Sequence, residues 1–550
     1  MSLAGNIYSL FRTQTAKYSE EAVFYRRKDN YWKEQTWAEF EEQVHSFACA
    51  LLACGLTKGT SLAILAGNIP EWTIVDIATI AAGGVGVGIY PTSSREQVEY
   101  IVNHSDAQFA FVDSAEQFEK LISANCPKLK RIVTLERIES SKAVFFEDFL
   151  SFGRSYLKEL LSEVERIGYE AKPEDIAIMV YTSGTTGKPK GAMLSHRYVL
   201  NSVESLRLSV PIFHNDVTLS YLPACHVAER ISGIYNRLYN GTAAYFVDDV
   251  SKLYEYMLEI KPTVFASLPR FFEKIYARII SEHGVKPDPK TVRDAFGGRI
   301  RLLTSGGAPL PLEVAEFFAS AGLPILQAYG LTENVCVAFN TFESYKIGTV
   351  GKPMPMCQVK IAPDGEILVK SEMMFSGYYK DPHKTKEMFD EEGWLKTGDI
   401  GEIDEDGFLK VTGRKKEIIV LSTGKKVAPL FIESAVKENH LVSQCFLYGD
   451  GRSYCVALVT LNENEAKLFA GSKNTNLDEL TKNEGILNSI RRTIEQVNSR
   501  VSSSEQIKKF LILPRDFSID LGEITPTMKL RREVIAENFK REIEKLYESS

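Results

Sequence analysis

The chain has 550 residues and a net charge of −7, and 44% of its residues are hydrophobic. At roughly 150 residues per domain, this length predicts two to four compact units with a sizeable core. Its 65 basic and 72 acidic side chains are mixed along the sequence without a basic stripe, so a nucleic-acid partner is not expected.

The cysteines and the apolar runs indicate the compartment. The eight cysteines form no Cys-x-x-Cys pair, which favours reduced thiols in a cytoplasmic protein. The first ten residues lack a basic segment followed by an apolar core, so a secretory signal is not expected. The longest apolar run, near residues 74–90, carries Asp76 and four glycines and is a poor membrane span. Any membrane contact would be peripheral, and monomer and homodimer both stay open.

In the first part of the chain, strands are expected to alternate with helices. Thr36 and Glu39 form a capping-box pattern at the start of a helix that stops at Gly55. Strands are then expected at 61–65, 85–90 and 109–112, with helices at 70–82 and after residue 96. This alternation predicts βαβ units on parallel strands. Residues 137–172 are less regular and are assigned only as a connector.

The same alternation resumes at residue 174, and the pattern then changes near residue 340. The strands expected before the change lie at 177–181, 218–221, 243–246, 264–267, 300–304 and 324–328. After it, short strands at 365–369, 398–403 and 408–411, with a turn at Asp404–Gly407, predict antiparallel pairing. A charged segment at Gly413–Lys416 opens a new mixed pattern.

We therefore predict an α/β protein with two domains. The large N-terminal domain spans 1–412 and contains two parallel-type α/β subdomains, 1–173 and 174–340, and a small antiparallel β-barrel, 341–412. A small mobile α+β domain follows at 413–550. Its last segment, 530–547, places apolar residues on one face and is predicted to be one docking helix rather than a membrane-surface helix.

The stretch Tyr181–Gly191 reads Tyr-Thr-Ser-Gly-Thr-Thr-Gly-Lys-Pro-Lys-Gly and follows a predicted buried strand. Its glycines let backbone N–H groups approach a phosphate, and its hydroxyls and lysines add donors and charge. The spacing excludes a P-loop, because only two residues separate Gly184 from Gly187 and Pro189 follows Lys188. The dinucleotide fingerprint also fails. Composition alone leaves a polyphosphate cradle or a flexible surface loop.

Further segments carry side chains that suit nucleotide chemistry. Gln327–Glu333 offers an aromatic face, a hydroxyl and a carboxylate that suits Mg²⁺. Thr304–Pro309 is a glycine turn after a predicted strand, and Asp399 follows a glycine in Gly393–Asp399. Taken singly, each is also typical of an ordinary turn, an N-cap or a charged surface.

Together and in this order, the motifs resemble the adenylate-forming superfamily, which comprises acyl-CoA synthetases, luciferases and peptide-synthetase adenylation domains. The resemblance covers nearly the whole chain. The segment Leu222–Arg230, Leu-Pro-Ala-Cys-His-Val-Ala-Glu-Arg, resembles long-chain fatty acyl-CoA synthetases in particular, as do Ile89–Ser94 and Leu268–Lys274. The chain departs from the common pattern at Gly413, where many relatives carry Asp, and at Met528, where glycine is commoner.

The resemblance implies a role for each motif. The implied ATP-binding residues are Thr182, Ser183, Gly184, Thr185, Thr186, Lys188, Gly306, Gly307, Ala308, Gln327, Tyr329, Gly330, Thr332, Asp399, Arg414 and Lys529. Among them, Tyr329 would stack on adenine, Thr332 would contact the α-phosphate, and Asp399 and Arg414 would hold the ribose. The implied catalytic residues are Lys529, Glu333 and Thr182, of which Glu333 and Thr182 would ligate Mg²⁺. His226 would border the acyl pocket, and Lys416 would be the hinge between the domains.

The implied reaction has two steps. ATP activates a long-chain fatty acid to acyl-AMP with release of pyrophosphate, and coenzyme A then takes the acyl group and releases AMP. Two alternatives stay open. One is an acyl-adenylating ligase that delivers to an acyl-carrier protein, and the other is a non-catalytic nucleotide- or lipid-binding relative.

Overall fold

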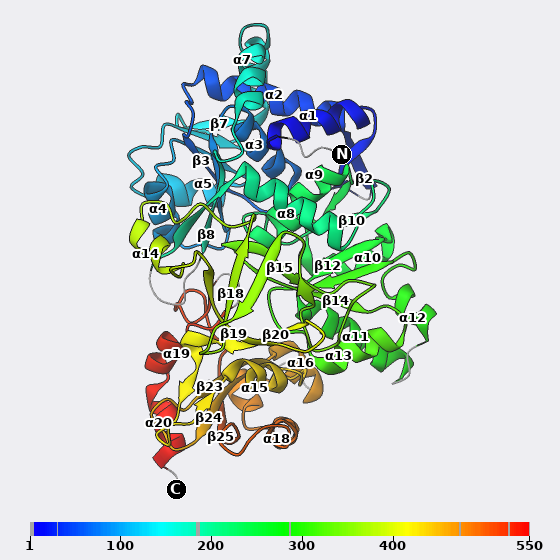
Figure 1. The fold of residues 1–550 in the computed structure, drawn as a ribbon, viewed down its shortest axis with the longest axis vertical. Coiled ribbons are helices and arrows are strands. Elements are labelled where there is room, and N and C mark those ends of the chain that lie inside the picture. Colours follow the sequence, from blue (N-terminus) through cyan, green and yellow to red (C-terminus); the bar gives the residue numbers. More distant parts are fainter. Residues whose placement is uncertain are drawn as a thin grey trace.

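The computed structural model describes residues 5–29, 31–182, 188–284, 288–471, 475–525 and 529–548. It is a mixed α/β protein with a large N-terminal part and a smaller C-terminal part, as the sequence predicts. In Figure 1, the elements after residue 417 lie mostly below the hairpin of β19 (Leu395–Ile403) and β20 (Leu409–Arg414), and most of the earlier elements lie above it or to its right. The two parts meet at the β19–β20 pair, where the site described below is built.

The largest sheet is mostly parallel and combines strands from both halves of the N-terminal part. In spatial order its strands are β7 (Ala143–Phe145), β6 (Arg131–Thr134), β5 (Phe109–Val112), β3 (Ser61–Leu65), β4 (Val85–Ile89), β8 (Ile176–Thr182) and β9 (Lys190–Ser195). β8 joins β4 in parallel, and β9 then returns antiparallel to β8. β3, β4 and β5 are buried along their whole length, which explains their unbroken apolar sequences. Tyr181–Gly191 therefore connects two strands of this sheet.

Helices pack around this sheet. They are α1 (Ile7–Tyr18), α2 (Trp37–Ala53), α3 (Pro70–Ala81), α4 (Arg95–His104), α5 (Ala115–Ile122), α6 (Phe146–Ser155), α7 (Leu157–Glu170), α8 (His196–Ser209) and α9 (Asn236–Asn240). The predicted capping box is present, since the Thr36 hydroxyl accepts from the Glu39 N–H at 3.2 Å. Residues 137–172, predicted only as a connector, contain β7, α6 and α7. α7 places Leu160, Leu161 and Val164 on one face, although only Val164 and Gly168 are fully buried.

A second and a third sheet complete the parallel-type region. One has the order β10 (Thr218–Ser220), β11 (Ala244–Phe246), β1 (Ala22–Lys28) and β2 (Tyr31–Thr36). The other has the order β12 (Val264–Ser267), β13 (Leu302–Ser305), β14 (Ile325–Leu331), β15 (Asn334–Phe339) and β16 (Lys352–Pro353). α10 (Leu253–Ile260), α11 (Pro269–His283), α12 (Pro289–Asp294) and α13 (Leu312–Ser320) accompany the third sheet. β12, β13 and β14 run parallel, so their carboxyl ends lie at one edge.

The predicted antiparallel unit is present as a sheet in the order β17 (Cys357–Ile361), β18 (Glu366–Ser371), β19 (Leu395–Ile403) and β20 (Leu409–Arg414). α14 (Pro382–Glu387) precedes β19. The turn at residues 404–407 joins β19 to β20, and the Asp404 carboxylate accepts from the Phe408 N–H at 2.8 Å. This hairpin places Asp399 opposite Arg414.

The C-terminal part contains two small sheets with helices around them. Its strands are β21 (Ile419–Val420), β22 (Lys426–Val427), β23 (Val442–Tyr448), β24 (Cys455–Leu461) and β25 (Ile507–Ile512). Its helices are α15 (Pro429–Val436), α16 (Glu463–Phe469), α17 (Leu477–Leu480), α18 (Glu484–Asn498), α19 (Arg532–Asn538) and α20 (Lys540–Glu548). The single final helix predicted over 530–547 is wrong, because the helix breaks at Phe539. Ile535, Phe539 and Ile543 lie on both sides of the break and at it, and all three enter one buried cluster.

Two sequence expectations concern thiols and membranes. All eight cysteines are unpaired. Among the described residues, no helix combines the length and the apolar character that crossing a bilayer requires.

Candidate active site

A cavity of about 2370 Å³ lies where the third sheet, the antiparallel sheet and the C-terminal part meet. Most of the described motif residues line it, although they come from distant parts of the sequence. They are Thr182, His226, Gly306, Gly307, Ala308, Gln327, Tyr329, Gly330, Thr332, Glu333, Asp399, Arg414, Lys416 and Lys529. Ser183, Gly184, Thr185 and Thr186 lie outside the described residues. The fold therefore gathers segments that are up to 347 positions apart, from residue 182 to residue 529.

Asp399 is the centre of a hydrogen-bonded group on one wall. The Tyr329 hydroxyl donates to Asp399 Oδ2 at 2.6 Å, and Arg414 Nε lies 3.2 Å from Asp399 Oδ1. The Asp399 N–H in turn donates to the Thr397 hydroxyl at 3.1 Å. Burial and then the Asp399 charge raise the pKa of Tyr329 well above its ordinary value, so Tyr329 stays a donor. The carboxylate is thus fixed in orientation at the cavity wall.

Gly398 lies within β19, at an irregularity in the pairing of β19 with β18, directly before Asp399. Its φ is +72°, a left-handed conformation in which glycine carries no steric penalty. Its N–H donates to Glu366 Oε1 at 2.9 Å, and Lys415 Nζ lies 2.7 Å from Glu366 Oε2. The charge of the Glu366 carboxylate is therefore balanced by Lys415, the residue after Arg414.

Thr332 and Glu333 occupy a turn between two antiparallel strands, β14 and β15, rather than the start of a helix. The Tyr198 hydroxyl donates to the Thr332 carbonyl at 2.9 Å and accepts from the Val335 N–H at 3.1 Å. Gly330 is required here, because a Cβ would overlap the Val335 carbonyl. These contacts hold the hairpin at the cavity.

The Glu333 carboxylate is buried, and the Tyr378 hydroxyl donates to its Oε1. Lys190 lies in the same region, with its ammonium 4.8 Å from the centre of the Tyr378 ring. Burial and then Lys384 lower the pKa of Lys190, while the Glu333 charge opposes this. Glu333 therefore lies close enough to Lys190 to interact with it electrostatically, and Lys384 acts on the same lysine.

Of the two lysines in the Tyr181–Gly191 stretch, only Lys190 lines the cavity in the described structure. The Lys188 side chain is exposed, and its ammonium lies 5.2 Å from the centre of the Tyr100 ring. The predicted Lys188 is thus absent from the cavity lining, and Lys190, which the sequence did not single out, is part of it.

Lys529 enters the cavity from the C-terminal part. Its N–H donates to the Thr525 hydroxyl at 3.1 Å, and the Thr525 N–H donates to the Lys529 carbonyl at 2.9 Å. The side chain is open to the cavity, yet enough protein surrounds it for burial to lower its pKa. Arg414 lowers this pKa further, and the Asp399, Glu417 and Glu333 charges oppose the shift. Lys529 therefore shares one electrostatic environment with residues of both parts.

His226 lines the cavity directly before the π-helix η1 (Ala228–Tyr235). Its Nδ1 accepts from the Ala228 N–H at 3.2 Å. Burial, and then the Lys529 charge, lower the pKa of His226 to about 4. The imidazole is therefore neutral at physiological pH, with the Nε2 proton available to a ligand.

Lys416 lies in a single turn, η3 (Lys415–Glu417), between β20 and β21. The residue is exposed and lines the cavity. It thus stands at the junction of the two parts, where the sequence places a hinge.

The acidic residues of the cavity suit magnesium bound with a nucleotide. Among the described residues, no group of three His, Cys, Asp or Glu side chains forms a metal cluster. Mg²⁺ commonly uses only one or two protein carboxylates and takes its other ligands from phosphates and water. The buried Glu333 carboxylate and the Thr182 hydroxyl, which line the same cavity, fit that kind of site.

Sequence reasoning missed the residues that hold the motifs in place. Tyr198 contacts Thr332 across 134 positions, and Tyr378 contacts Glu333 across 45. Nothing in the sequence links such pairs. Lys190 could have been found, since it belongs to the Tyr181–Gly191 stretch.

The chain matches known protein families over most of its length. The model of the AMP-binding enzyme family matches residues 11–379, and that of the AMP-binding enzyme C-terminal domain matches residues 416–550. The chain is 35% identical to long-chain-fatty-acid–CoA ligase FadD15 of Mycobacterium bovis, over 96% of this chain and 94% of the relative. It is 32% identical to peroxisomal long chain acyl-CoA synthetase 6 of Arabidopsis thaliana, over 94% and 82%. One similar solved structure is the adenylation domain of the Segniliparus rugosus carboxylic acid reductase, in complex with AMP and a carboxylic acid. It superimposes with a TM-score of 0.78 at 22% identity, and the match covers 98% of this chain and 94% of that chain.

Proposed function

The chain belongs to the AMP-binding enzyme family, and on this premise we propose that it is a long-chain fatty acid–CoA ligase that forms AMP. Its substrates are a long-chain fatty acid, ATP and coenzyme A. The relatives named above carry this activity in their names and align over nearly their whole length. The observation that carries the proposal is the position of Lys529, which faces the same cavity as Asp399 and Glu333 although it comes from the C-terminal part.

In the first step the fatty carboxylate attacks the α-phosphorus of ATP, and pyrophosphate leaves. Both reactants are anionic, so the protein must supply positioning and positive charge. We assign the ribose to Asp399 and Arg414, and adenine to the face of Tyr329. Lys529 places its ammonium between the attacking carboxylate and the α-phosphate. Thr182 and the residues after it hold the departing phosphates, with Lys190 adding charge beside them.

Glu333 and Thr182 would hold Mg²⁺, which supplies positive charge at the phosphates when bound. Tyr378 keeps the Glu333 carboxylate oriented by donating to Oε1. Because this hydrogen bond uses Oε1, the second oxygen of the Glu333 carboxylate, Oε2, would be the one to ligate a cation.

In the second step the thiol of coenzyme A attacks the carbonyl of acyl-AMP, and AMP leaves. The thiol must reach a carbonyl that Lys529 approaches in the first step. Rotation of the C-terminal part about Lys416 would withdraw Lys529 and open that path. The exposed position of Lys416 between β20 and β21 is compatible with such a change in backbone angles.

The deciding experiment measures AMP and acyl thioester formation with a ladder of fatty acids from about eight to about twenty carbons and an aryl acid. Acceptors are coenzyme A and, in parallel, an acyl-carrier protein. We expect AMP with long-chain acids and thioester only on coenzyme A. Thioester only on the carrier protein would identify a carrier-protein ligase instead. Absence of fatty-acid-dependent pyrophosphate exchange would identify a non-catalytic relative.

A further inference from the structure

One part of the cavity is an apolar chamber. The chamber is lined by aliphatic and aromatic side chains from α8, β12, β13, β15 and the loops beside them. They are Leu206, Val210, Ile212, Val264, Leu302, Phe339 and Met354. The charged side chains Glu229 and Arg237, which line the cavity as well, pair with each other at 2.6 Å. The chamber therefore offers a long apolar chain a surface without uncompensated charge.

The chamber runs along two parallel strands away from the nucleotide site. Ser305 ends β13 at the motif that lines the nucleotide region, whereas Leu302 begins the same strand. Val264 is paired with Leu302 at the start of β12. At about 3.3 Å per residue, the amino ends of these strands lie roughly 10 Å from their carboxyl ends. A fatty acid with its carboxylate near Lys529 therefore points its methyl end toward the amino ends.

At that end the chamber is closed by a loop, residues 210–217, which joins α8 to β10. Val210 and Ile212 line the cavity, while Pro211 and Phe213 face solvent, with Phe213 53% exposed. Successive side chains thus point to opposite sides of the loop. One thickness of chain separates the chamber from the outside.

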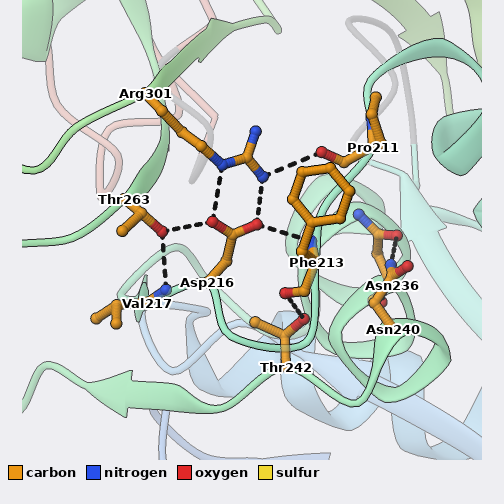
Figure 2. Close-up of polar contacts among 9 residues, drawn as sticks. All are labelled: Pro211, Phe213, Asp216, Val217, Asn236, Asn240, Thr242, Thr263 and Arg301. Carbon is orange, nitrogen blue, oxygen red and sulfur yellow. Dashed lines mark hydrogen bonds and ion pairs between the residues drawn. The ribbon is translucent and has the colours of Figure 1, made fainter.

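Asp216 and Arg301 pin this loop to the strands, as Figure 2 shows. Arg301 Nε donates to Asp216 Oδ1 at 2.8 Å, and its Nη2 reaches Oδ2. The Thr263 hydroxyl donates to Oδ1 at 2.6 Å, and the Phe213 N–H donates to Oδ2 at 2.7 Å. Arg301 also donates to the Pro211 carbonyl at 3.1 Å and covers the Phe213 ring at 4.7 Å.

The anchors of the loop are the immediate neighbours of the chamber lining. Arg301 directly precedes Leu302, and Thr263 directly precedes Val264. Moving the loop outward therefore requires the Asp216 carboxylate to give up its contacts to both strands. The Asp216 side chain is only 5% exposed, and separating a buried charge from its partner is costly.

We propose that the loop at residues 210–217 is the end wall of the acyl chamber and that the Asp216–Arg301 pair, by holding this wall shut, sets the longest acyl chain that the protein accepts. This inference rests on the proposed function. Acids that end before the wall bind without touching the pair. Longer acids have to leave methylene groups unburied or displace the loop, and each unburied methylene lowers affinity about fourfold.

The test measures kcat/KM for AMP release with saturated acids from about eight to about twenty-four carbons. The variants are Ile212→Trp, which fills the end of the chamber and leaves the ion pair intact, and Arg301→Leu, which releases the loop. Arg299→Leu is the matched control, because Arg299 is exposed and does not line the cavity. The readout is the ratio of kcat/KM for long acids to kcat/KM for short acids. It is compared only between variants whose melting temperatures match that of the parent protein.

We expect Ile212→Trp to lower this ratio about fourfold for each methylene that it excludes. Arg301→Leu should raise it for acids longer than the parent protein accepts, and Arg299→Leu should keep the parent profile. A folded Ile212→Trp protein with the parent profile, or a loss that is equal for every chain length, would overturn the inference. If the parent protein releases no AMP with any fatty acid, the proposed function has failed instead, so the two failures are distinguishable.

Discussion

The two ends of the cavity are built in different ways. The end that we assign to the nucleotide uses polar side chains, some of them oriented by hydrogen-bond partners, as Asp399 is by Tyr329 and Arg414. The acyl end is lined by apolar side chains from scattered elements, which pack against one another. Hydrogen bonds depend on fractions of an ångström, whereas apolar burial scales with area. Substitutions should therefore act steeply at the first end and gradually at the second.

The strongest test of this contrast is Lys529→Ala. The change removes the positive charge that we place between the fatty carboxylate and the α-phosphate, so acyl-AMP formation should fall by about 10² to 10³-fold. Thioester formation from supplied acyl-AMP should stay close to the parent rate. Pyrophosphate exchange and thioester release measure the two steps separately.

Lys482→Ala is the matched control, because Lys482 is an exposed lysine of the C-terminal part paired with Asp478. It should leave both steps unchanged. An equal loss of both steps in Lys529→Ala would contradict the role assigned to Lys529. It would also weaken the contrast between the two ends of the cavity where the largest effect is expected.

Asp399→Asn should give the next largest effect. The change keeps the shape of the side chain but removes the charge that accepts from Tyr329 and Arg414. Hydrogen bonds to a charged group contribute about 1.5–3 kcal/mol, so the KM for ATP should rise about 10- to 100-fold. The KM for the fatty acid should change little. Steady-state kinetics with each substrate varied in turn would show this separation, and an equal rise in both values would argue that Asp399 only supports the fold.

Sequence reasoning predicted more of the residues that line the polar end of the cavity than of those that line the apolar end, and the physical reason is the same contrast. Strands such as 61–65 and 264–267 were predicted at their exact bounds because they are short apolar runs between turns. Motif residues lie within or directly after strands, so the strand pattern helped to locate them. The chamber lining has no common motif, and the pairing of β8 with β4 across the chain is not encoded locally. The roles assigned to the site residues and the domain boundary at 413 stay predictions.

The pH dependence of acyl-AMP formation should give a smaller effect that reports on Lys529. Burial, and then Arg414, lower the pKa of this ammonium below the ordinary lysine value. Because the protonated form is required, the rate is full below that pKa and falls about tenfold per pH unit above it. The alkaline limb should therefore begin at a lower pH than an ordinary lysine would give. His226, with a pKa of about 4, should add no limb near neutrality.

Lys529→Arg provides the control for this limb, because a guanidinium stays charged throughout the accessible pH range. The variant should be slower but should lose the alkaline limb. Persistence of the same limb in Lys529→Arg would assign it to another group.

The smallest effect is expected at the acyl end, from Leu206→Val. Leu206 lines the chamber from α8 and is 9% exposed, and the change removes one methylene from its wall. The KM for a long fatty acid should rise by no more than about fourfold, because one methylene contributes about 0.8 kcal/mol when buried. The KM for ATP should not change. An increase in the KM for ATP as large as that of Asp399→Asn would contradict this expectation. It would mean that the two ends of the cavity are coupled, so that polar contacts at one end and apolar burial at the other do not act independently.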